Sequence, residues 1–390
     1  MSLQDLDFKD KKVLVRVDFN VPLDAEGHIV DDTRIREAIP TIQYILQKGG
    51  RVILLSHFGR PKGRDPKLSL KPCAQRLAQL LNKPVAFASD CLGEEAKQEV
   101  AKLTNGSLLL LENLRFYPAE EDPESDPTFA QKLAELGDLY INDAFGAAHR
   151  KHSSTYTIVK HFPGKAAPGL LIQKELTFLN ALLAHPEHPF YALIGGSKVS
   201  SKIGMLQSLL SKVDGLFIAG AMAYTFFKAQ GLEIGDSLYE KDFITTAKDF
   251  LNACSSKKIP LFLPLDNVIT NQAAEIQIVA NTIPPGWRGM DIGPATIKEW
   301  KHALSNAKTI FWNGPVGVFE IPAFATGTHE IAQTLAHLSC TKIVGGGDSI
   351  AAINALNLAH QFTHLSTGGG ASLEYLEKGH LPGIDILFNF

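Results

Sequence analysis

The sequence predicts an α/β protein with two Rossmann-like, doubly wound parallel-sheet domains joined by a helical hinge. The strand-like segments are short, apolar and continuous rather than alternating, which is typical of strands buried on both faces of a parallel sheet. Helical stretches separate these segments, as the crossovers of such a sheet require. At 390 residues the chain is long for one core and suits two domains of ordinary size.

The expected elements alternate along both halves of the chain. Predicted strands of the first half are Val13–Val17, Val52–Leu55, Val85–Ala88, Leu108–Leu111 and Leu139–Ile141. Those of the second half are Tyr191–Ile194, Leu216–Ala219, Leu261–Leu263, Ile276–Val279, Thr309–Trp312, Lys342–Val344 and His364–Leu365. Predicted crossover helices include Cys73–Leu81, Phe129–Leu136, Lys202–Leu210 and Phe243–Ala253.

The expected domain boundaries follow from this order. We expect a first domain over residues 1–170, a connecting helix over 171–184, a second domain over 185–370, and a tail over 371–390 that returns to the first domain. Two crossings between domains favour a hinge, and we expect the domains to close when both ligands are bound.

Composition excludes several classes of protein. A net charge of −3 argues against a general nucleic-acid binder, and no apolar run approaches the ~18 residues of a membrane span. The four cysteines have no metal-ligand spacing, so we interpret them as free thiols of a reducing compartment. We therefore expect a soluble cytoplasmic protein that binds neither nucleic acid nor membrane. We also expect it to be a monomer.

Arginine and glycine are distributed unevenly. Nine of the ten arginines lie in the first 150 residues, whereas the glycine runs Gly195-Gly196, Gly345–Gly347 and Gly368–Gly370 lie in the second half. Arginine binds anions through a planar fork, and glycine lets backbone N–H groups approach phosphates. Drift in residue usage, with glycines that serve only as turns, would give the same counts, so position in the fold has to decide.

Polar residues follow the predicted strands, and ligands bind beyond the carboxyl ends of strands in such sheets. In the first half these residues are Asp18, Asn20, His57, Gly59, Arg60, Glu112, Asn113, Arg115, Asn142 and Asp143. In the second half they are Gly195, Gly196, Lys198, Gly220, Asp266, Asn313, Gly345–Asp348 and Gly368–Gly370. This separation fits an anionic small substrate on one domain and a nucleotide on the other.

Two common nucleotide signatures are absent from the sequence. There is no G-x-x-x-x-G-K-[ST], and no G-x-G-x-x-G follows the first strand. A triphosphate would then be held at the helix N-termini that open after Gly347 and Gly370. A single Gly-Gly-Gly is as often a plain turn as a phosphate site, but two in one domain, one of them followed by Asp348, favour a phosphate site.

Over nearly its whole length the sequence resembles the phosphoglycerate kinase family. Strings that carry the resemblance are Val15–Pro22, Ser56–Pro61, Glu112–Phe116, Asn142–Phe145, Ala148–Arg150, Gly195–Val199, Trp312–Glu320, Gly345–Ser349, Ser366–Ser372 and Leu381–Ile384. The order of these strings makes the match specific.

The resemblance implies the following sites. It implies that 3-phosphoglycerate or 1,3-bisphosphoglycerate is bound by Asp18, Asn20, Arg34, His57, Gly59, Arg60, Arg115 and Arg150. It implies that MgATP or MgADP is bound by Gly196, Lys198, Lys202, Asn313, Glu320, Gly345, Gly346, Gly347, Asp348 and Ser349. It also implies that Arg34, Lys198 and Gly369 act on the transferred phosphoryl group and that Asp348 holds Mg²⁺.

The implied reaction transfers a phosphoryl group reversibly between ATP and the 1-carboxylate of 3-phosphoglycerate. A carboxylate is already ionised near neutral pH, so no general base is required. The sequence departs from the family pattern at Ser197 and Ser201, which stand where Ala and Asp are expected. Lys198 and Lys202 keep their spacing of four, which on the first turn of a helix would place both on one face.

Other arginines and histidines have plainer interpretations. Arg16, Arg51 and Arg76 are expected to be structural or solvated, and Lys151 and His152 to face solvent. Arg34 is expected to precede a helix that begins near Ala38.

Two other functions remain open at this point. A nicotinamide dehydrogenase also has two α/β domains, although its glycine fingerprint is absent. A non-catalytic sensor of a phosphorylated metabolite would share the arginine patch but would need neither Lys198 nor Asp348.

Overall fold

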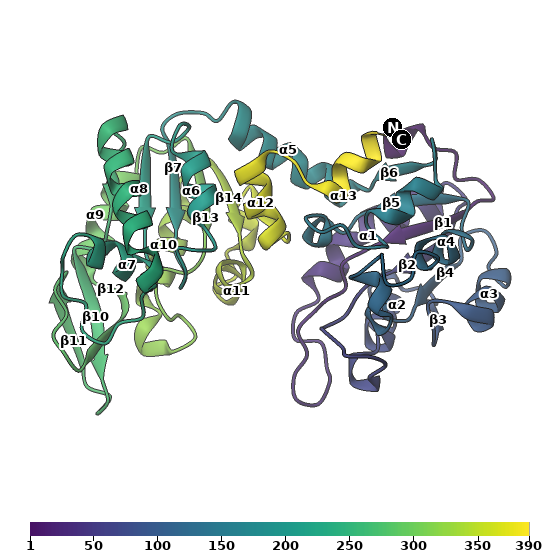
Figure 1. Cartoon of the computed structure of the whole chain (residues 1–390), viewed down its shortest axis with the longest axis horizontal. Helices are drawn as coiled ribbons and strands as arrows, with labels where there is room; N and C mark the ends of the chain where they lie inside the picture. The colour runs from purple at the N-terminus through teal and green to yellow at the C-terminus, as the bar shows by residue number, and fades with distance from the viewer. Residues whose placement is uncertain (390) are drawn as a thin grey trace. The chain divides into compact units, whose positions relative to one another are not determined.

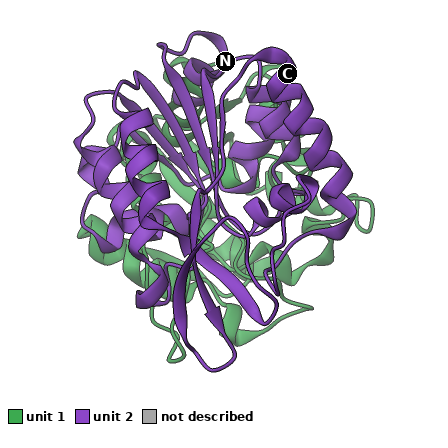
Figure 2. Ribbon diagram, turned by 90° about the vertical axis from the view of Figure 1, so that its left-hand side faces the viewer, with its two compact units in different colours: residues 1–177, 380–390 green, residues 178–379 purple. Residues whose placement is uncertain are grey.

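The computed structural model describes residues 1–389. The chain divides into two compact units, Met1–Thr177 with His380–Phe390, and Phe178–Gly379 (Figure 2). The domain boundaries expected from the sequence stay a prediction.

Unit 1 contains a six-stranded parallel sheet in the order β3-β4-β2-β1-β5-β6 (Figure 1). Its strands are β1 (Lys12–Arg16), β2 (Arg51–Leu55), β3 (Ala86–Ala88), β4 (Leu108–Leu111), β5 (Leu139–Asn142) and β6 (Ala166–Pro168). Its helices are α1 (Thr33–Gln47), α2 (Lys71–Leu81), α3 (Gly93–Ala101), α4 (Phe129–Ala134) and α13 (Pro382–Asp385). The strand β1 pairs with β2 on one side and with β5 on the other. The chain therefore adds strands first on one side of β1 and then on the other, so the strand order reverses at β1.

The continuous apolar runs are explained by two cores, one on each face of this sheet. Val13 and Val15 of β1 pack in one core, and Leu14 packs in the other. Residues of β2 alternate in the same way, with Val52 on the first face and Ile53 on the second. Both faces are covered, which explains why the central positions of these strands, Val13–Val15 and Val52–Leu55, are all apolar.

Unit 2 contains a second six-stranded parallel sheet, in the order β15-β14-β13-β7-β8-β9. Its strands are β7 (Phe190–Ile194), β8 (Gly215–Ile218), β9 (Leu261–Phe262), β13 (Thr309–Asn313), β14 (Thr341–Gly345) and β15 (His364–Ser366). Its helices are α6 (Ile203–Leu209), α7 (Met222–Ala229), α8 (Ile244–Lys257), α9 (Pro294–Leu304), α10 (Thr326–His337), α11 (Gly347–Ala355) and α12 (Gly370–Lys378). These two parallel sheets confirm the predicted fold class.

A three-stranded antiparallel sheet in unit 2 was not expected from the sequence. It has the order β11-β10-β12 and consists of β10 (Asp266–Asn271), β11 (Ile276–Ala280) and β12 (Trp287–Ile292). The predicted strand Ile276–Val279 lies here, at an edge, with Ile276 and Ile278 49% and 58% exposed. An apolar run therefore does not by itself indicate a strand buried on both faces.

The helix α5 (Leu170–Ala184) crosses the boundary between the units in the chain. Asp143 caps its first turn, because the Asp143 carboxylate accepts hydrogen bonds from Leu171 N at 2.9 Å and Ile172 N at 3.3 Å. Burial raises the pKa of Asp143 to about 7. Among residues 1–389, no helix combines the length and apolarity that membrane crossing requires.

Candidate active site

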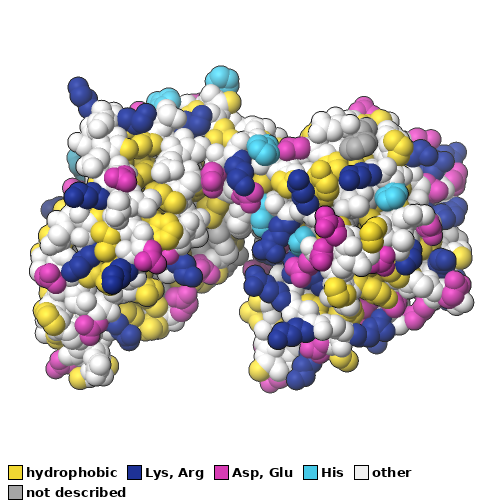
Figure 3. Space-filling model, in the orientation of Figure 1, with side chains coloured by type: hydrophobic (Ala, Val, Ile, Leu, Met, Phe, Trp, Pro, Cys, Tyr) yellow, Lys and Arg dark blue, Asp and Glu magenta, His cyan; other side chains and the backbone are white. Residues whose placement is uncertain are grey.

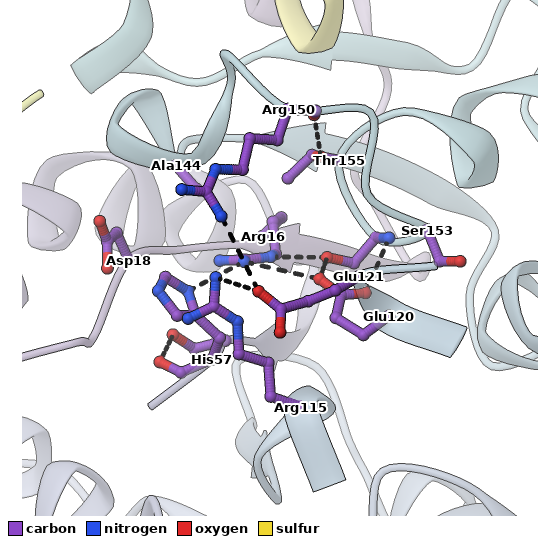
Figure 4. Close-up of polar contacts among 12 residues, drawn as sticks. Arg16, Asp18, His57, Arg115, Glu120, Glu121, Ala144, Arg150, Ser153 and Thr155 are labelled. Atoms are coloured by element: carbon purple, nitrogen blue, oxygen red, sulfur yellow. Dashed lines mark hydrogen bonds and ion pairs between the residues drawn. The ribbon is translucent and has the colours of Figure 1, made fainter. Parts of the chain in front are cut away.

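The predicted substrate residues of unit 1 follow strands that are neighbours in the sheet. Asp18 follows β1, His57 follows β2, Arg115 lies in a 3₁₀ helix (Leu114–Phe116) after β4, and Arg150 lies beyond β5. Because the strands are parallel, their carboxyl ends meet at one edge of the sheet. Figure 4 shows that this brings the His57, Arg115 and Arg150 side chains into one cluster.

Arg34 is held by the residues that follow β1. Its Nη1 donates to Asp18 Oδ2 and to the Asn20 carbonyl, both at 3.1 Å. Burial alone would raise the pKa of Asp18, but the charges around it, chiefly that of Arg34, hold this pKa below its usual value. The expectation that Arg34 precedes the helix was wrong, because α1 begins at Thr33 and Arg34 lies in its first turn.

Arg16 orients the His57 ring through a buried hydrogen bond. Arg16 is fully buried, and its Nη2 lies 3.1 Å from His57 Nδ1. A guanidinium can only donate, so Nδ1 accepts and the ring proton lies on Nε2. Burial, and after it the positive charge of the neighbouring arginines, lowers the pKa of His57 well below its ordinary value. His57 is therefore a neutral hydrogen-bond donor at neutral pH.

Arg16 is itself fixed by buried acceptors. Its Nε donates to Ser154 Oγ at 2.8 Å, and its Nη2 lies 3.8 Å from Glu120 Oε1. Glu120 is also fully buried and accepts from Ser154 Oγ at 2.6 Å. Arg16 is therefore a structural arginine, as expected. The residue that it orients, His57, is a candidate substrate ligand.

Arg115 and Arg150 share one acidic neighbour. Arg115 Nη2 lies 3.0 Å from Glu121 Oε1, and Arg150 Nη1 lies 4.0 Å from the same oxygen (Figure 4). Arg115 Nη1 donates to the Gly59 carbonyl at 2.8 Å, and Asn20 Oδ1 accepts from Gly59 N at 2.9 Å. The turn at Gly59 therefore links the residues after β1 to Arg115.

The remaining basic residues of unit 1 differ in exposure, although many Lys and Arg side chains lie on the face of this unit that Figure 3 shows. Arg60 is exposed beside Gly59. The expectation that His152 faces solvent was wrong: it is only 5% exposed, and burial lowers its pKa to about 3, with Arg16, Arg115 and Arg150 adding to the shift. A position next to Arg150 in the sequence does not reveal this, because the burial comes from a segment distant in the sequence: Ser153 N donates to the Glu120 carbonyl, and residues 152–155 are all buried.

Unit 2 has a cavity of about 290 Å³ that adjoins the predicted nucleotide residues. It is lined by Gly196, Ser197, Gly220, Ala221, Tyr224, Leu238, Gly289, Met290, Pro315, Val316, Gly317, Val318, Glu320 and Asp348. Gly196, Glu320 and Asp348 are expected from the sequence, whereas Tyr224, Leu238 and Met290 are not. The latter are apolar or aromatic side chains from α7, a loop and β12, and carry no motif of their own.

The two lysines of the glycine loop do not share a helix face, contrary to the expectation. The helix α6 begins at Ile203, so both lysines precede it. Lys198 is exposed, whereas Lys202 is buried, with its Nζ 2.6 Å from the Gly195 carbonyl and 2.7 Å from Asn313 Oδ1. Burial lowers the pKa of Lys202 to about 8. Lys202 thus joins the loops after β7 and β13.

Two predicted helix starts are observed. The helix α11 begins at Gly347 after Gly346 with φ +93°, and α12 begins at Gly370 after Gly369 with φ +53°. Residues that carry a side chain rarely adopt such positive φ angles, which accounts for glycine at both positions. Asp348 is exposed in the first turn of α11.

Other predicted nucleotide residues are buried behind these turns. Ser349 is fully buried, and its Oγ accepts from Gly314 N at 2.7 Å. Asn313 is 2% exposed, and its Nδ2 has no hydrogen-bond partner among the described residues. Gly345 is the last residue of β14 and pairs with Asn313 in the sheet. These residues position the loops, and Asn313 keeps one donor available.

Comparison with known proteins gives a consistent result. A family model described as phosphoglycerate kinase matches residues 3–379. A cytosolic phosphoglycerate kinase of Triticum aestivum is 53% identical, covering 98% of this chain and 96% of its own. A phosphoglycerate kinase of Dictyoglomus turgidum is 50% identical, covering 99% and 98%.

The solved structures lead to the same family. The phosphoglycerate kinase of Coxiella burnetii has a TM-score of 0.86 at 38% identity, and covers 100% of this chain and 99% of its own. The enzyme of Pyrococcus horikoshii has a TM-score of 0.88 at 29% identity, with the same coverage. Together with the strand-end clusters of both units, these matches show that the chain belongs to the phosphoglycerate kinase family, the kinases that transfer a phosphoryl group between ATP and 3-phosphoglycerate.

Proposed function

We propose that unit 1 binds 3-phosphoglycerate, that unit 2 binds MgATP, and that the residues named above carry out the transfer between them. The observation that carries the proposal is the cluster of Arg115, Arg150 and neutral His57 at one sheet edge (Figure 4). Arg34 is held near His57 by Asp18. A phosphorylated carboxylic acid is a ligand that such a set of donors fits.

The substrate contacts divide by position. Arg60, Arg115, Arg150 and the Nε2–H of His57 would bind the 3-phosphate. Asp18 and the Asn20 carbonyl orient Arg34, and Asn20 also fixes the Gly59 turn. Arg34 would then meet the charge that develops on the transferred phosphoryl group.

The nucleotide contacts come from the loops of unit 2. The apolar cavity beside Tyr224 would receive the base, and Glu320 at its rim would bind the ribose. The first turns of α11 and α12 present backbone N–H groups, which suit phosphate oxygens. Lys198 would bind the phosphates directly, while Lys202 and Ser349 hold the loops in shape.

The chemistry requires charge stabilisation rather than proton transfer. The attacking carboxylate is already ionised, so alignment and neutralisation of the moving phosphoryl group account for the rate. Arg34, Lys198 and the backbone N–H groups at Gly369 and Gly370 would supply the positive charge. Because both substrates are required, the connecting helix is proposed to act as a hinge.

Mg²⁺ fits the donor set at the start of α11. Asp348 is an exposed carboxylate at the rim of the cavity, and Mg²⁺ in kinases takes one or two carboxylates together with substrate phosphates. When bound, Mg²⁺ would neutralise phosphate charge. We also propose that the protein acts as a cytoplasmic monomer, without nucleic-acid or membrane partners.

Replacing Asp348 by Asn is expected to weaken MgATP binding by about 10–100-fold, the range for a lost hydrogen bond or contact to a charged group. Binding of 3-phosphoglycerate should not change, because Asp348 lies in unit 2. Isothermal calorimetry with each ligand measures both effects. Asp249→Asn on α8 is the control, since it removes the same charge from an exposed position of the same unit. Equal MgATP affinity in the two variants would exclude Asp348 as the metal ligand.

The direct test is a coupled assay with 3-phosphoglycerate and ATP, with and without Mg²⁺. We expect 3-phosphoglycerate-dependent formation of ADP that requires Mg²⁺. Binding of both ligands without turnover would indicate a sensor, and binding of NADH in place of ATP would indicate a dehydrogenase.

A further inference from the structure

Glu121 occupies the position at which the arginine pair would meet an external anion. Its Oε1 lies 3.0 Å from Arg115 Nη2 and 4.0 Å from Arg150 Nη1, and Figure 4 shows its carboxylate between the two guanidinium groups. The residue was not identified from the sequence as part of any site. It follows the 3₁₀ helix Pro118–Glu120 and is distant in the sequence from the ends of β4 and β5.

The contact uses a donor that the substrate would need. The Arg115 side chain is only 9% exposed, and its Nη1 already donates to the Gly59 carbonyl. Its Nη2 is directed to Glu121 instead. Burial lowers the pKa of Arg115 and Glu121 raises it, which shows that the carboxylate compensates a charge that solvent reaches poorly.

Glu121 differs from its neighbour Glu120 in how firmly it is held. Glu120 is fully buried and is tied to Arg16 and Ser154. The Glu121 side chain is 44% exposed, and exposed ion pairs contribute little net free energy. Glu121 can therefore leave the arginines without disturbing the core.

We propose that Glu121 is an internal counter-anion of Arg115 and Arg150, which the 3-phosphate of the substrate displaces. This inference rests on the proposed function, because it assumes that these arginines bind the substrate. A carboxylate tethered next to its partners competes at high effective concentration. The Glu121 carboxylate therefore lowers the affinity of Arg115 and Arg150 for every external anion, and anions of low charge no longer bind measurably. A phosphate of about two negative charges, assisted by the other substrate contacts, still binds.

The test compares Glu121→Gln with the parent protein, using inorganic sulfate and 3-phosphoglycerate as probes in calorimetry without nucleotide. Glutamine keeps the size and removes the charge. We expect both probes to bind about 2–5-fold more tightly, the range for removing one exposed ion pair. Glu124→Gln is the control, since it removes the same charge from an exposed position three residues further along the chain. Equal changes in the two variants, or none in Glu121→Gln, would overturn the inference.

A third variant separates this inference from the proposed function. Arg150→Gln should weaken 3-phosphoglycerate binding about tenfold or more, as expected for a lost contact to a charged group. Unchanged binding in that variant would show that the arginine pair is not the phosphate site. Weaker binding in Arg150→Gln, together with matching affinities in the two glutamate variants, would leave the phosphate site in place and reject the role of Glu121.

Discussion

Arg34→Ala is expected to lower kcat by about 10²–10⁵, the range for removing a donor that acts on a transferring group in the transition state. ATP affinity should hardly change, since Arg34 lies in unit 1. The side chain is held by Asp18 and by the Asn20 carbonyl, so it is oriented before substrate arrives. Steady-state kinetics and nucleotide titration measure the two effects.

Arg36→Ala provides the matched control for Arg34. Arg36 lies two residues further along α1 and is exposed. Its Nε lies 2.7 Å from Asp32 Oδ1, and it makes this pair rather than one with Asp18. Its removal should leave kcat within a factor of about two, the scale of surface substitutions. A near-normal kcat in Arg34→Ala would remove Arg34 from the mechanism.

Arg16→Met is expected to have the largest effect on stability. It removes the hydrogen bond to Ser154 and leaves Glu120 without its cation in a fully buried position, where burial already raises the pKa of this carboxyl group. Loss of one partner from a buried pair costs about 3–5 kcal/mol. Urea unfolding of the variant measures this loss directly.

A second variant distinguishes the charge from the packing of Arg16. Arg16→Met combined with Glu120→Gln should recover part of the stability, because glutamine needs no counter-charge. Arg51→Met removes an arginine whose Nε donates to Asn105 Oδ1 at 2.9 Å near the surface, and should cost about 0.5 kcal/mol or less. If the double variant is no more stable than Arg16→Met, the unpaired charge of Glu120 is not the cause.

The parallel sheets could be predicted because burial on both faces leaves a continuous apolar signature. Val13–Val17 is one such run, interrupted only by Arg16, and the structure places its apolar residues in two cores. The antiparallel sheet could not be predicted in the same way. The strands β10 (Asp266–Asn271) and β12 (Trp287–Ile292) contain polar and glycine residues, and only part of each is buried. The strand β6 (Ala166–Pro168) is too short to show any period.

The residues of the candidate site also differ in whether the sequence predicts them. Residues next to strand ends, such as Asp18, His57 and Asp348, could be predicted because topology fixes where strand ends meet. Glu121, Arg16 and His152 could not, because their importance comes from side chains distant in sequence. The different exposures of Lys198 and Lys202 depend on where α6 begins, and the sequence contains no clear cap for that helix.

The last residues of the chain belong to the same unit as the first 177 residues. Ile386 and Leu387 pack in the core beside β4 and β5, and Gly383 bonds to Ala148 and Asn142 through its backbone. Synthesis from the N-terminus therefore delivers all of unit 2 before unit 1 is complete. Unit 1 therefore needs residues from both ends of the chain to complete its hydrophobic core, whereas the uninterrupted segment Phe178–Gly379 forms unit 2 by itself. A chain shortened by its last residues would lose part of the core of unit 1 while keeping every residue of unit 2.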